Sequence, residues 1–589
     1  MNFNYDLNKD QEIKSRDGLE FILKYFKSHT FSISIIIFLL LISNVLGQVL
    51  LPKLLQTAID KDIPSGDINN LRNTVITAIF LLLIYTLLNY LRVRWIGSLG
   101  QKILFKIRED IFKKIQTLPT QFISDNQTGD IIQRLTGNVD GISQFFQEGL
   151  MRLLNILFVV LTILITMSFI NWELALISIL GTFFILLFLF FQGKFIEKYI
   201  KKSLEKEGNI SAKTQETLDG FLAIQTMNQQ ESWVNQFSSL TNEYFDISKK
   251  ITILSSLGDA FLILMTILTA GSTLLLSLSF MSQGILTLGT VVLFNTYTQS
   301  LFRSLDGVSR IWQTIKTGIE SGSRLDEILK LKNDITVPTI AFAPNNFRGD
   351  IEFRDVDFRY KEDEIVLSDV NFTAKAGDTV AIVGPTGGGK TTFVNLIARL
   401  YDVNNGAILV DGQNVKEWDL DILRKNIGYL IQDTFLFEDT IINNLRYNNE
   451  DVTEKEALDM FEFLGAGNLI TKLPKGLNTK ISSEGDNLSS GQRQIIALAR
   501  ILLRNPKILI LDEATARIDT KSEKMLQKAI EKASEGKTTF IIAHRLSTIF
   551  NADKIILIKD NTILEQGSHE ELIRKKGFYS EMYSKFVGN

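Results

Sequence analysis

Apolar residues are concentrated in six stretches, all within the first 320 positions of the 589-residue chain. A helix of about 20 apolar residues spans the hydrocarbon core of a bilayer. The six stretches lie at residues 31–51, 74–94, 150–170, 173–193, 257–279 and 288–309. The pattern therefore predicts an all-α membrane domain with six spans. About 30 polar and charged residues precede the first stretch and no small-residue cleavage site follows it, so we expect the stretch to be retained.

The polar segments between these stretches differ in charge. Segments 95–149 and 194–256 are long and rich in Lys and Arg, whereas the short segments near Asn171 and from Met281 to Leu286 have neither. Because basic segments stay in the cytoplasm, we expect the long segments and both termini to be cytoplasmic. Long unstructured loops are uncommon, so helices that continue into the cytoplasm are favoured over solvated loops.

The pattern changes after residue 348. Short β-branched strands alternate with amphipathic helices from there to the end, which is typical of an α/β domain with a largely parallel sheet. Segment 320–348 carries Pro338 and Pro344 and has no apolar periodicity. We therefore predict a transmembrane domain at 1–319, a linker at 320–348 and an α/β P-loop domain at 349–589.

A glycine-rich loop follows the apolar run Val380–Val383 and precedes a helical pattern. It contains Gly384, Pro385, Thr386, Gly387, Gly388, Gly389, Lys390, Thr391 and Thr392. Glycines in such a loop let backbone N–H groups surround phosphates, Lys390 can reach the β- and γ-phosphates, and the Thr391 hydroxyl can bind Mg²⁺. The sequence therefore predicts a nucleotide site.

A second apolar run, residues 508–511, ends in Asp512-Glu513. Two carboxylates at the carboxyl end of a buried strand lie where α/β sheets bind ligands. Asp512 suits Mg²⁺, and Glu513 suits the general base that activates water. A solvated strand end is the alternative.

Residues 487–494 form a polar turn before a helical run, and include Leu488, Ser489, Ser490, Gly491 and Gln492. A helix N-terminus with a Ser hydroxyl is a possible anion site. From the residues alone, a simple helix cap is equally consistent.

Composition limits the other possibilities. The net charge of −3 gives no basic footprint for nucleic acid. The 45% hydrophobic content fits a chain that is partly in a membrane. There are no cysteines and three histidines, so disulfides and thiolate metal sites are excluded.

With these motifs in this order, the second half resembles an ATP-binding cassette and the whole chain resembles a half-transporter of the ABC exporter family. Further positions match the family: the adenine-stacking aromatic, the Q-loop, the signature, the D-loop and the switch histidine, which are Tyr360, Gln432, Leu488–Gln492, Asp519 and His544. The resemblance implies that Gln432, Glu513 and His544 are catalytic, and that Thr391, Gln432 and Asp512 hold Mg²⁺ beside ATP. Ser490 and the segment 516–519 depart from the commonest family residues.

The resemblance also implies a partner. In this family, ATP lies between the P-loop of one cassette and the signature of a second, and this chain has one set. A second half-transporter is therefore expected, in a bacterial cell membrane. A heterodimer is favoured, because residues 484–519 are similar to the catalytically complete subunit of heterodimeric multidrug exporters. An identical partner remains the alternative.

The predicted function is ATP-driven efflux of amphipathic or hydrophobic compounds by alternating access, with a lipid flippase as the alternative. Charged residues within spans usually face the bundle interior. Asp259 and Arg303 near the ends of the last two stretches, with Phe294 and Tyr297, are therefore candidates for a substrate cavity; snorkelling or ion pairing at the interface is equally open. Elbows near residues 125–130 and 214–220 are expected to transmit force between the domains.

Overall fold

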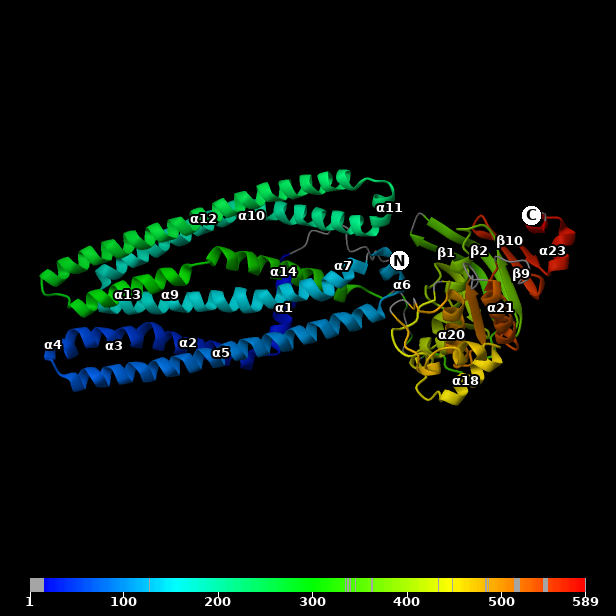
Figure 1. Ribbon diagram of the computed structural model, residues 1–589, viewed down its shortest axis with the longest axis horizontal. Coiled ribbons are helices and arrows are strands. Elements are labelled where there is room, and N and C mark those ends of the chain that lie inside the picture. The colour runs from blue at the N-terminus through cyan, green and yellow to red at the C-terminus, as the bar shows by residue number, and fades with distance from the viewer. Residues whose placement is uncertain are drawn as a thin grey trace. The chain divides into compact units, whose positions relative to one another are not determined.

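The computed structural model describes residues 15–126, 128–333, 335, 338, 341–344, 346–361, 364–432, 434–447, 449–482, 485, 487–512, 520–543 and 549–587. The chain divides into two compact units (Figure 1). Among the described residues, one unit is helical and holds residues 15–117 and 126–331, and the other holds those from Lys332 onward together with Leu118–Asp125. This confirms the predicted fold class of a helical domain followed by an α/β domain.

The helical unit is built from long helices and several short ones. They are α1 (Ser15–Lys27), α2 (Thr30–Asn44), α3 (Leu51–Thr57), α4 (Ile63–Ser65), α5 (Ile68–Thr117), α7 (Thr128–Gln133), α8 (Val139–Gln144), α9 (Met151–Ile170), α10 (Trp172–Asp219), α11 (Phe221–Thr226), α12 (Gln230–Ser282), α13 (Leu288–Leu305) and α14 (Val308–Lys330). Four π-helical segments interrupt them: η1 (Val45–Leu50), η2 (Ala58–Asp62), η3 (Arg134–Asn138) and η4 (Phe145–Leu150).

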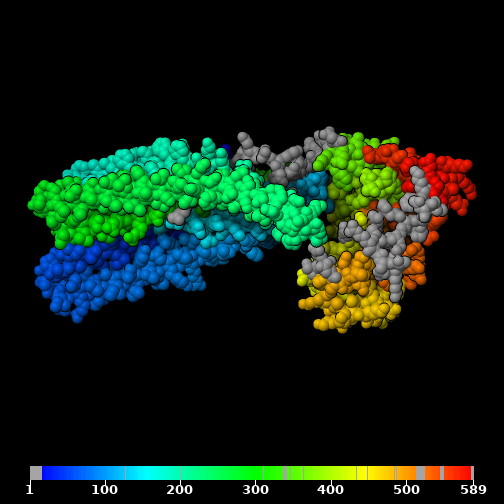
Figure 2. Space-filling view, turned by 45° about the horizontal axis from the view of Figure 1, so that its top comes forward, coloured from blue at the N-terminus to red at the C-terminus, as the bar shows by residue number. Residues whose placement is uncertain are grey.

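Five helical stretches in the described part are long and apolar enough to cross a membrane: Thr30–Ser65, Ile68–Thr117, Thr128–Ile170, Trp172–Asp219 and Gln230–Ser282. The expected sixth span is α13, which has only 18 residues and carries several polar ones, Asn295, Thr296 and Thr298 among them. Helix α12 has 53 residues, or about 80 Å at 1.5 Å per residue. A bilayer core is about 30 Å thick, so α12 extends well beyond it, as expected (green in Figure 2).

Two of the π-helical segments have a visible cause in the sequence. Segments η1 and η2 lead directly into α3 and α4, which carry Pro52 and Pro64 as their second residues. Proline has no N–H to donate and its ring crowds the preceding turn. The helix widens there, as is common where its hydrogen-bond ladder is disturbed.

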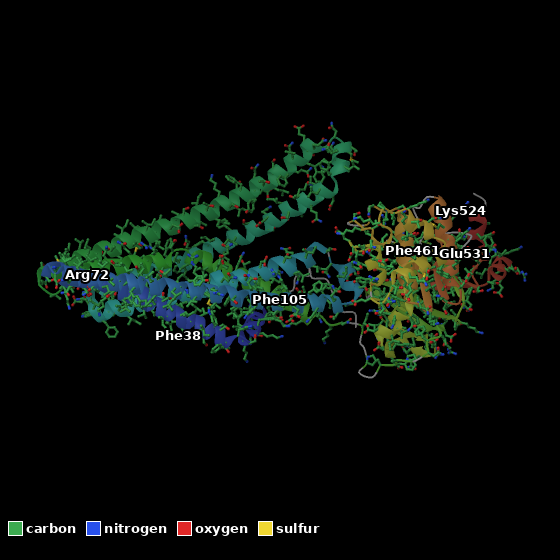
Figure 3. The ribbon with its side chains drawn as sticks, turned by 60° about the horizontal axis from the view of Figure 1, so that its bottom comes forward. Phe38, Arg72, Phe105, Phe461, Lys524 and Glu531 are labelled. Atoms are coloured by element: carbon green, nitrogen blue, oxygen red, sulfur yellow. The ribbon has the colours of Figure 1, made fainter. Side chains whose placement is uncertain are left out.

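Burial separates the inside of the helical unit from its surface. Helix α13 lies inside, since ten of its residues are buried. A Cβ on Gly181 of α10 would lie 2.5 Å from the Thr269 hydroxyl of α12 and 3.3 Å from the Phe302 ring, so the three helices pack closely there. On the outside, Phe38 on α2 and Phe105 on α5 are exposed (Figure 3).

The second unit contains two sheets. A four-stranded antiparallel sheet has the order β2-β1-β4-β5, and a six-stranded sheet has the order β10-β9-β3-β8-β7-β6. The strands are β1 (Ile351–Lys361), β2 (Glu364–Ala374), β3 (Thr379–Val383), β4 (Asn405–Val410), β5 (Gln413–Asn414), β6 (Ile427–Leu430), β7 (Ile508–Asp512), β8 (Thr538–Ile542), β9 (Lys554–Lys559) and β10 (Thr562–Gly567). Among the strands that the structure describes in the larger sheet, β10 pairs antiparallel with β9, and the other pairings are parallel.

Helices surround this larger sheet. They are α15 (Lys390–Ile397), α16 (Leu420–Lys425), α17 (Ile441–Arg446), α18 (Glu454–Phe463), α19 (Gly467–Thr471), α20 (Ser490–Leu502), α21 (Thr520–Ser534), α23 (His569–Lys575) and α24 (Phe578–Val587). Phe461 of α18 is fully buried in a hydrophobic core with α20 and α21 (Figure 3). Helix α6 (Thr120–Asp125) belongs to this unit although it lies early in the sequence.

The structure places the end of the helical domain later than expected. Helix α14 continues through the predicted boundary at residue 319 and ends at Lys330. The sequence pattern also did not predict the antiparallel sheet, because the sequence of a strand does not show which other strand it pairs with.

Candidate nucleotide-binding site

The glycine-rich loop lies between β3 and α15, as predicted. Gly384, Gly387 and Gly389 have φ angles of 147°, 80° and 96°, which side chains with a Cβ adopt only with strain. A Cβ on Gly384 would also lie 2.1 Å from the carbonyl oxygen of Ile558. The loop therefore requires glycine at this position both for its backbone conformation and for space.

Lys390 begins α15 and is buried, with 7% of its surface exposed. Its Nζ donates hydrogen bonds to the carbonyl oxygens of Gly384 and Pro385, at 3.0 and 2.8 Å. The ammonium group is thus held inside the curve of the loop. A cation enclosed by glycine backbone at a helix N-terminus is suited to bind phosphate.

The strand order brings the predicted metal ligands to the same edge of the sheet. Asp512 ends β7 and is 9% exposed. Leu430 at the end of β6 pairs with Leu511, so Gln432, two residues further on, follows the same edge. Burial, with a contribution from Asp512, raises the pKa of Tyr429 on β6. Thr391, at the start of α15, is exposed.

These residues fit a magnesium ion held mainly by nucleotide. Within the described residues no group of three or more His, Cys, Asp or Glu is arranged to hold a metal. Mg²⁺ in nucleotide enzymes is usually held by one or two carboxylates together with phosphates and water. The hydroxyl of Thr391, the carboxylate of Asp512 and the amide of Gln432 are a donor set of that kind.

Tyr360 borders the loop from β1. Its hydroxyl and that of Thr392 are 3.0 Å apart, and its ring lies edge-on to Tyr401 with centroids 5.1 Å apart. Helix α6 contacts the same region, because Gln121 Nε2 donates to the carbonyl oxygen of Tyr360 at 3.2 Å. Burial, with contributions from Tyr360 and Asp125 of α6, raises the pKa of Tyr401 to about 12.

The signature residues form a helix cap. Ser489 Oγ accepts from the N–H of Gln492 at 3.2 Å, and the Gln492 side chain accepts from the N–H of Ser489 at 2.8 Å, a capping box at the start of α20. Leu488 and Gly491 are buried, Ser489 is exposed, and Ser490 is half-buried. The cap interpretation is therefore correct locally, and it leaves the anion-binding role as a prediction.

Three predicted site residues, Glu513, Asp519 and His544, lie outside the described residues. The described part includes the strands that precede Glu513 and His544: β7 ends at Asp512 and β8 ends at Ile542, and the two strands pair in the sheet.

The four candidates for a substrate cavity divide into two kinds. Phe294 and Tyr297 are buried in the core of the helical unit, with 0% and 1% of their surface exposed. Asp259 and Arg303 are exposed. Their role in substrate binding stays a prediction.

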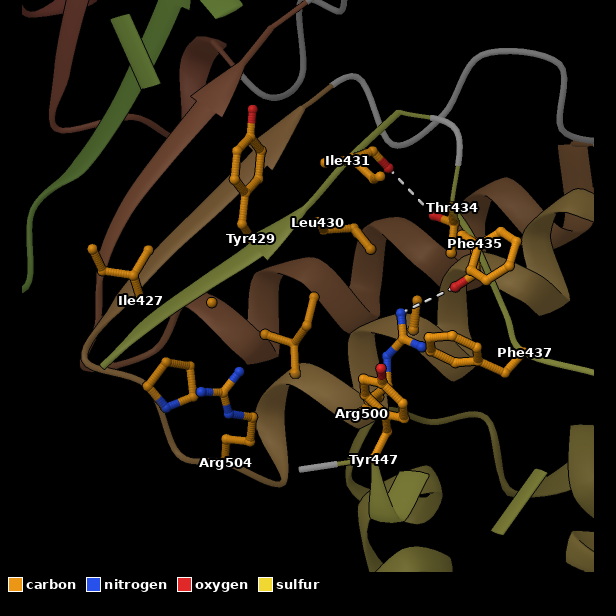
Figure 4. A pocket seen from close by; sticks show the side chains of 14 residues that line it. Ile427, Tyr429, Leu430, Ile431, Thr434, Phe435, Phe437, Tyr447, Arg500 and Arg504 are labelled. Atoms are coloured by element: carbon orange, nitrogen blue, oxygen red, sulfur yellow. Dashed lines mark hydrogen bonds between the residues drawn. The ribbon is translucent and has the colours of Figure 1, made fainter. Parts of the chain in front are cut away.

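The sequence analysis did not find a second feature of the α/β unit, an aromatic pocket of about 320 Å³ (Figure 4). Exposed Phe435 and Phe437 lie on one side, and Phe437 stacks on Tyr447 at 4.3 Å. Arg500 of α20 donates to the carbonyl oxygen of Phe435 at 3.1 Å, and burial lowers its pKa. The only signal in the sequence was the cluster of aromatic residues after Gln432.

Comparison with known proteins agrees with this geometry. Residues 34–305 match the family model for the ABC transporter transmembrane region, and residues 367–516 match the model described as ABC transporter. A probable multidrug resistance ABC transporter ATP-binding/permease protein, YheH of Bacillus subtilis (strain 168), is 34% identical over 82% of this chain and 72% of its own length.

Two further relatives extend the comparison. An ATP-dependent lipid A-core flippase of Desulfotalea psychrophila is 35% identical over 82% of this chain and 85% of its own. The structure of a bacterial Atm1-family ABC exporter with ATP bound has a TM-score of 0.81 and 26% identity, covering 94% of this chain and 98% of that one. With the phosphate loop and the long apolar helices in one chain, these matches show that the protein is a membrane-bound, ATP-hydrolysing member of the ABC exporter family.

Proposed function

We propose that this chain is one half of a dimeric exporter that uses Mg²⁺-ATP to move amphipathic or hydrophobic compounds out of a bacterial cell. The observation that carries the proposal is the buried Lys390 in its glycine loop, within the same polypeptide as five helices that can span a membrane. The multidrug name of the Bacillus subtilis relative supports this substrate class. The termini and the long helical extensions are cytoplasmic in this proposal, following the basic segments.

In this mechanism the loop amides and Lys390 hold the phosphates of ATP. Thr391, Asp512 and Gln432 would hold Mg²⁺, which when bound would neutralise charge on the phosphates. Glu513 takes a proton from the attacking water. His544 donates a hydrogen bond to the γ-phosphate, where negative charge must be stabilised.

The site needs a second cassette. The exposed Ser489 at the start of α20 is proposed to cover the ATP of a partner, while the partner's signature covers the ATP on Lys390. The closure of both sites drives alternating access. We favour a related, non-identical partner, on the similarity of residues 484–519 to the complete subunit of heterodimeric exporters. Full, cooperative ATPase activity of this chain purified alone would exclude that choice.

Two elbows are proposed to transmit closure to the spans. Helix α6 contacts the backbone of Tyr360. Helix α11 presents Phe221 and Leu222, which are 56% and 76% exposed. An exposed apolar elbow and an aromatic pocket are complementary, so we infer that α11 docks beside Phe435. Cysteines introduced at Leu222 and Phe435 should therefore crosslink. Because the chain has no cysteine of its own, a crosslink must involve these two positions. No crosslink in any nucleotide state would exclude this contact, and gel mobility would show whether it joins one chain or two.

Lipid transport is the second candidate function, because a relative at 35% identity is named a lipid A-core flippase. The exposed charges Asp259 and Arg303 could meet either kind of substrate. Arg303→Ala with unchanged drug-stimulated ATPase activity would remove Arg303 from the site.

Inverted membrane vesicles test the proposal directly. Uptake of a fluorescent dye, and separately of a labelled lipid, is measured with ATP for the wild type and for Glu513→Gln. We expect ATP-dependent dye uptake that is lost in Glu513→Gln, together with steady-state ATPase activity. Lipid uptake without dye uptake would support the flippase. ATPase activity that survives in Glu513→Gln would refute the catalytic assignment.

A further inference from the structure

Helix α1 differs from the other long elements because it runs across the helical unit instead of along it (dark blue in Figure 1). Its inner face is firmly attached. Phe21, Ile22 and Phe26 are at most 6% exposed, and the ring of Phe26 lies 4.8 Å from that of Phe146 in η4. Helix α1 therefore packs across the long helices of the bundle.

Its closest contact is with α14. A Cβ on Gly18 would lie 1.9 Å from the carbonyl oxygen of Ile319, and a Cβ on Gly322 would lie 2.8 Å from the carbonyl oxygen of Gly18. Two glycines thus allow the two backbones to touch. Lys330, the last residue of α14, lies 3.8 Å from Asp17. Helices α1 and α14 should therefore move together. A ligand that fixes the position of α1 would also restrain the end of α14, from which the chain continues to the α/β unit.

The outer face of α1 is unusual for a surface helix. Leu19 and Leu23, one turn apart, are 40% and 55% exposed. Beside them lie the exposed basic residues Lys24 and Lys27, for which the described part of the chain provides no ion pair. Arg16 pairs with Glu20 at 2.9 Å, so the outer face carries a net positive charge.

Apolar and basic residues side by side on a helix are typical of the membrane interface, where leucines enter the acyl region and lysines reach the headgroups. The position agrees, because α2 begins three residues after α1 and starts a candidate span with exposed Phe31. Capping of the helix C-terminus could explain the lysines, but it does not explain the two exposed leucines.

We propose that the outer face of α1, formed by Leu19, Leu23, Lys24 and Lys27, binds anionic lipid headgroups, and that bound lipid, by fixing α1 against α14, raises the coupled ATPase activity. The choice of the inner leaflet rests on the cytoplasmic orientation in the proposed function. The binding itself depends on the basic and apolar residues of the outer face, and the effect on ATPase activity depends on the contact between α1 and α14. Each lysine near an anionic surface strengthens association by about fivefold.

The test uses the full-length transporter in nanodiscs of phosphatidylcholine with increasing phosphatidylglycerol. ATPase activity is measured against the fraction of phosphatidylglycerol for the wild type and for Lys24→Gln/Lys27→Gln. We expect activity to rise with phosphatidylglycerol in the wild type, and the double variant to need about 25-fold more anionic lipid. High salt should weaken the response, because the Debye length falls from about 10 Å at 0.1 M to about 3 Å at 1 M.

Two variants make the outcome specific. Lys524→Gln/Lys528→Gln removes the same charge from exposed positions on α21 (Lys524 in Figure 3) and should keep the wild-type response. Gly18→Ala pushes α1 from α14, so it should abolish the ATPase response while headgroup binding, measured by quenching with spin-labelled phosphatidylglycerol, is retained.

A wild type that ignores phosphatidylglycerol, or a Lys24→Gln/Lys27→Gln variant with the full response, would overturn the proposal. If the response survives in that variant and is lost in Arg303→Ala, the lipid acts as substrate, and the flippase function is supported instead. Loss of dye transport with an intact lipid response would refute the multidrug function and leave the role of α1 standing.

Discussion

Removal of the Asp60 carboxylate should detach the end of the first span from α13. Asp60 lies in η2 and accepts two hydrogen bonds from the start of α13: one from the Thr287 hydroxyl at 2.6 Å and one from the N–H of Gly289 at 2.7 Å. Gly289 is buried and has no room for a side chain, because a Cβ there would lie 2.6 Å from the Asp60 carboxyl carbon. The carboxylate and the glycine therefore form one fitted contact.

The size of the effect follows from these two bonds. A hydrogen bond to a charged group contributes about 1.5–3 kcal/mol, and Asp60 is half-exposed, so the lower figure applies. Asp60→Ala should cost about 3 kcal/mol, and Asp60→Asn, which keeps one acceptor, about half of that. At about 2 °C per kcal/mol for a large domain, Asp60→Ala should lower the melting temperature of the helical unit by about 6 °C.

A double-mutant cycle with Gly289→Ala checks the reasoning. Gly289→Ala alone should destabilise strongly, because its Cβ collides with Asp60. In an Asp60→Ala background, where the obstructing carboxylate is gone, the cost of Gly289→Ala should fall. Thermal melting followed by intrinsic fluorescence of the detergent-purified protein measures all four proteins.

The control is Asp67→Ala, which removes a local cap of α5, where Asp67 accepts from the N–H of Asn69 at 2.9 Å. A cap is worth about 1 kcal/mol, so this control should shift melting by about 2 °C. If Asp60→Ala melts no lower than Asp67→Ala, or if the cycle shows purely additive effects, the contact does not hold the two helices together.

Three further results are expected. Gly384→Ala should abolish binding of a fluorescent ATP analogue and lower the melting temperature of the α/β unit, because its Cβ would collide with the carbonyl oxygen of Ile558 on β9; retained binding would refute the tight loop. Arg134→Ala should lower the stability of the helical unit by about 2 kcal/mol, measured by thermal melting, because Arg134 is 8% exposed and bonds Glu327 at 2.8 Å; a Lys replacement should restore part of it. The backbone N–H of Asp369 is the main reason that the pKa of Asp357 lies below its usual 3.8, so its contribution to stability should be present above about pH 4 and lost as the pH falls further. Asp357→Asn should therefore show a weaker loss of stability on acidification, and an unchanged acid profile would contradict this.

Much of the architecture was readable from local sequence. A run such as Trp172–Leu189 is apolar enough to predict a span whatever its neighbours are, because the bilayer itself supplies the apolar partner. The phosphate loop could also be predicted from local sequence. Gly384 and Gly389 adopt positive φ angles, which glycine reaches without strain, and a helix follows the loop directly. The order of the strands could not be read this way, although Asp512 was correctly expected at the carboxyl end of a buried strand.

The tertiary structure decided what the faces of the helices meet. Tyr297 and Phe294 have the composition of a ligand-binding wall, yet they lie in the core, since burial depends on which helices surround α13. The aromatic pocket combines β6 and the segment after it, including Tyr447 just beyond α17, with α20, which comes much later in the sequence. The attachment of α1 to α14 depends on two glycines about 300 positions apart, Gly18 and Gly322. Local sequence determines the approximate length of an element and the backbone angles it can adopt. Contacts between distant segments form only when the chain folds, because their energy comes from burying the surface of one segment against the surface of another.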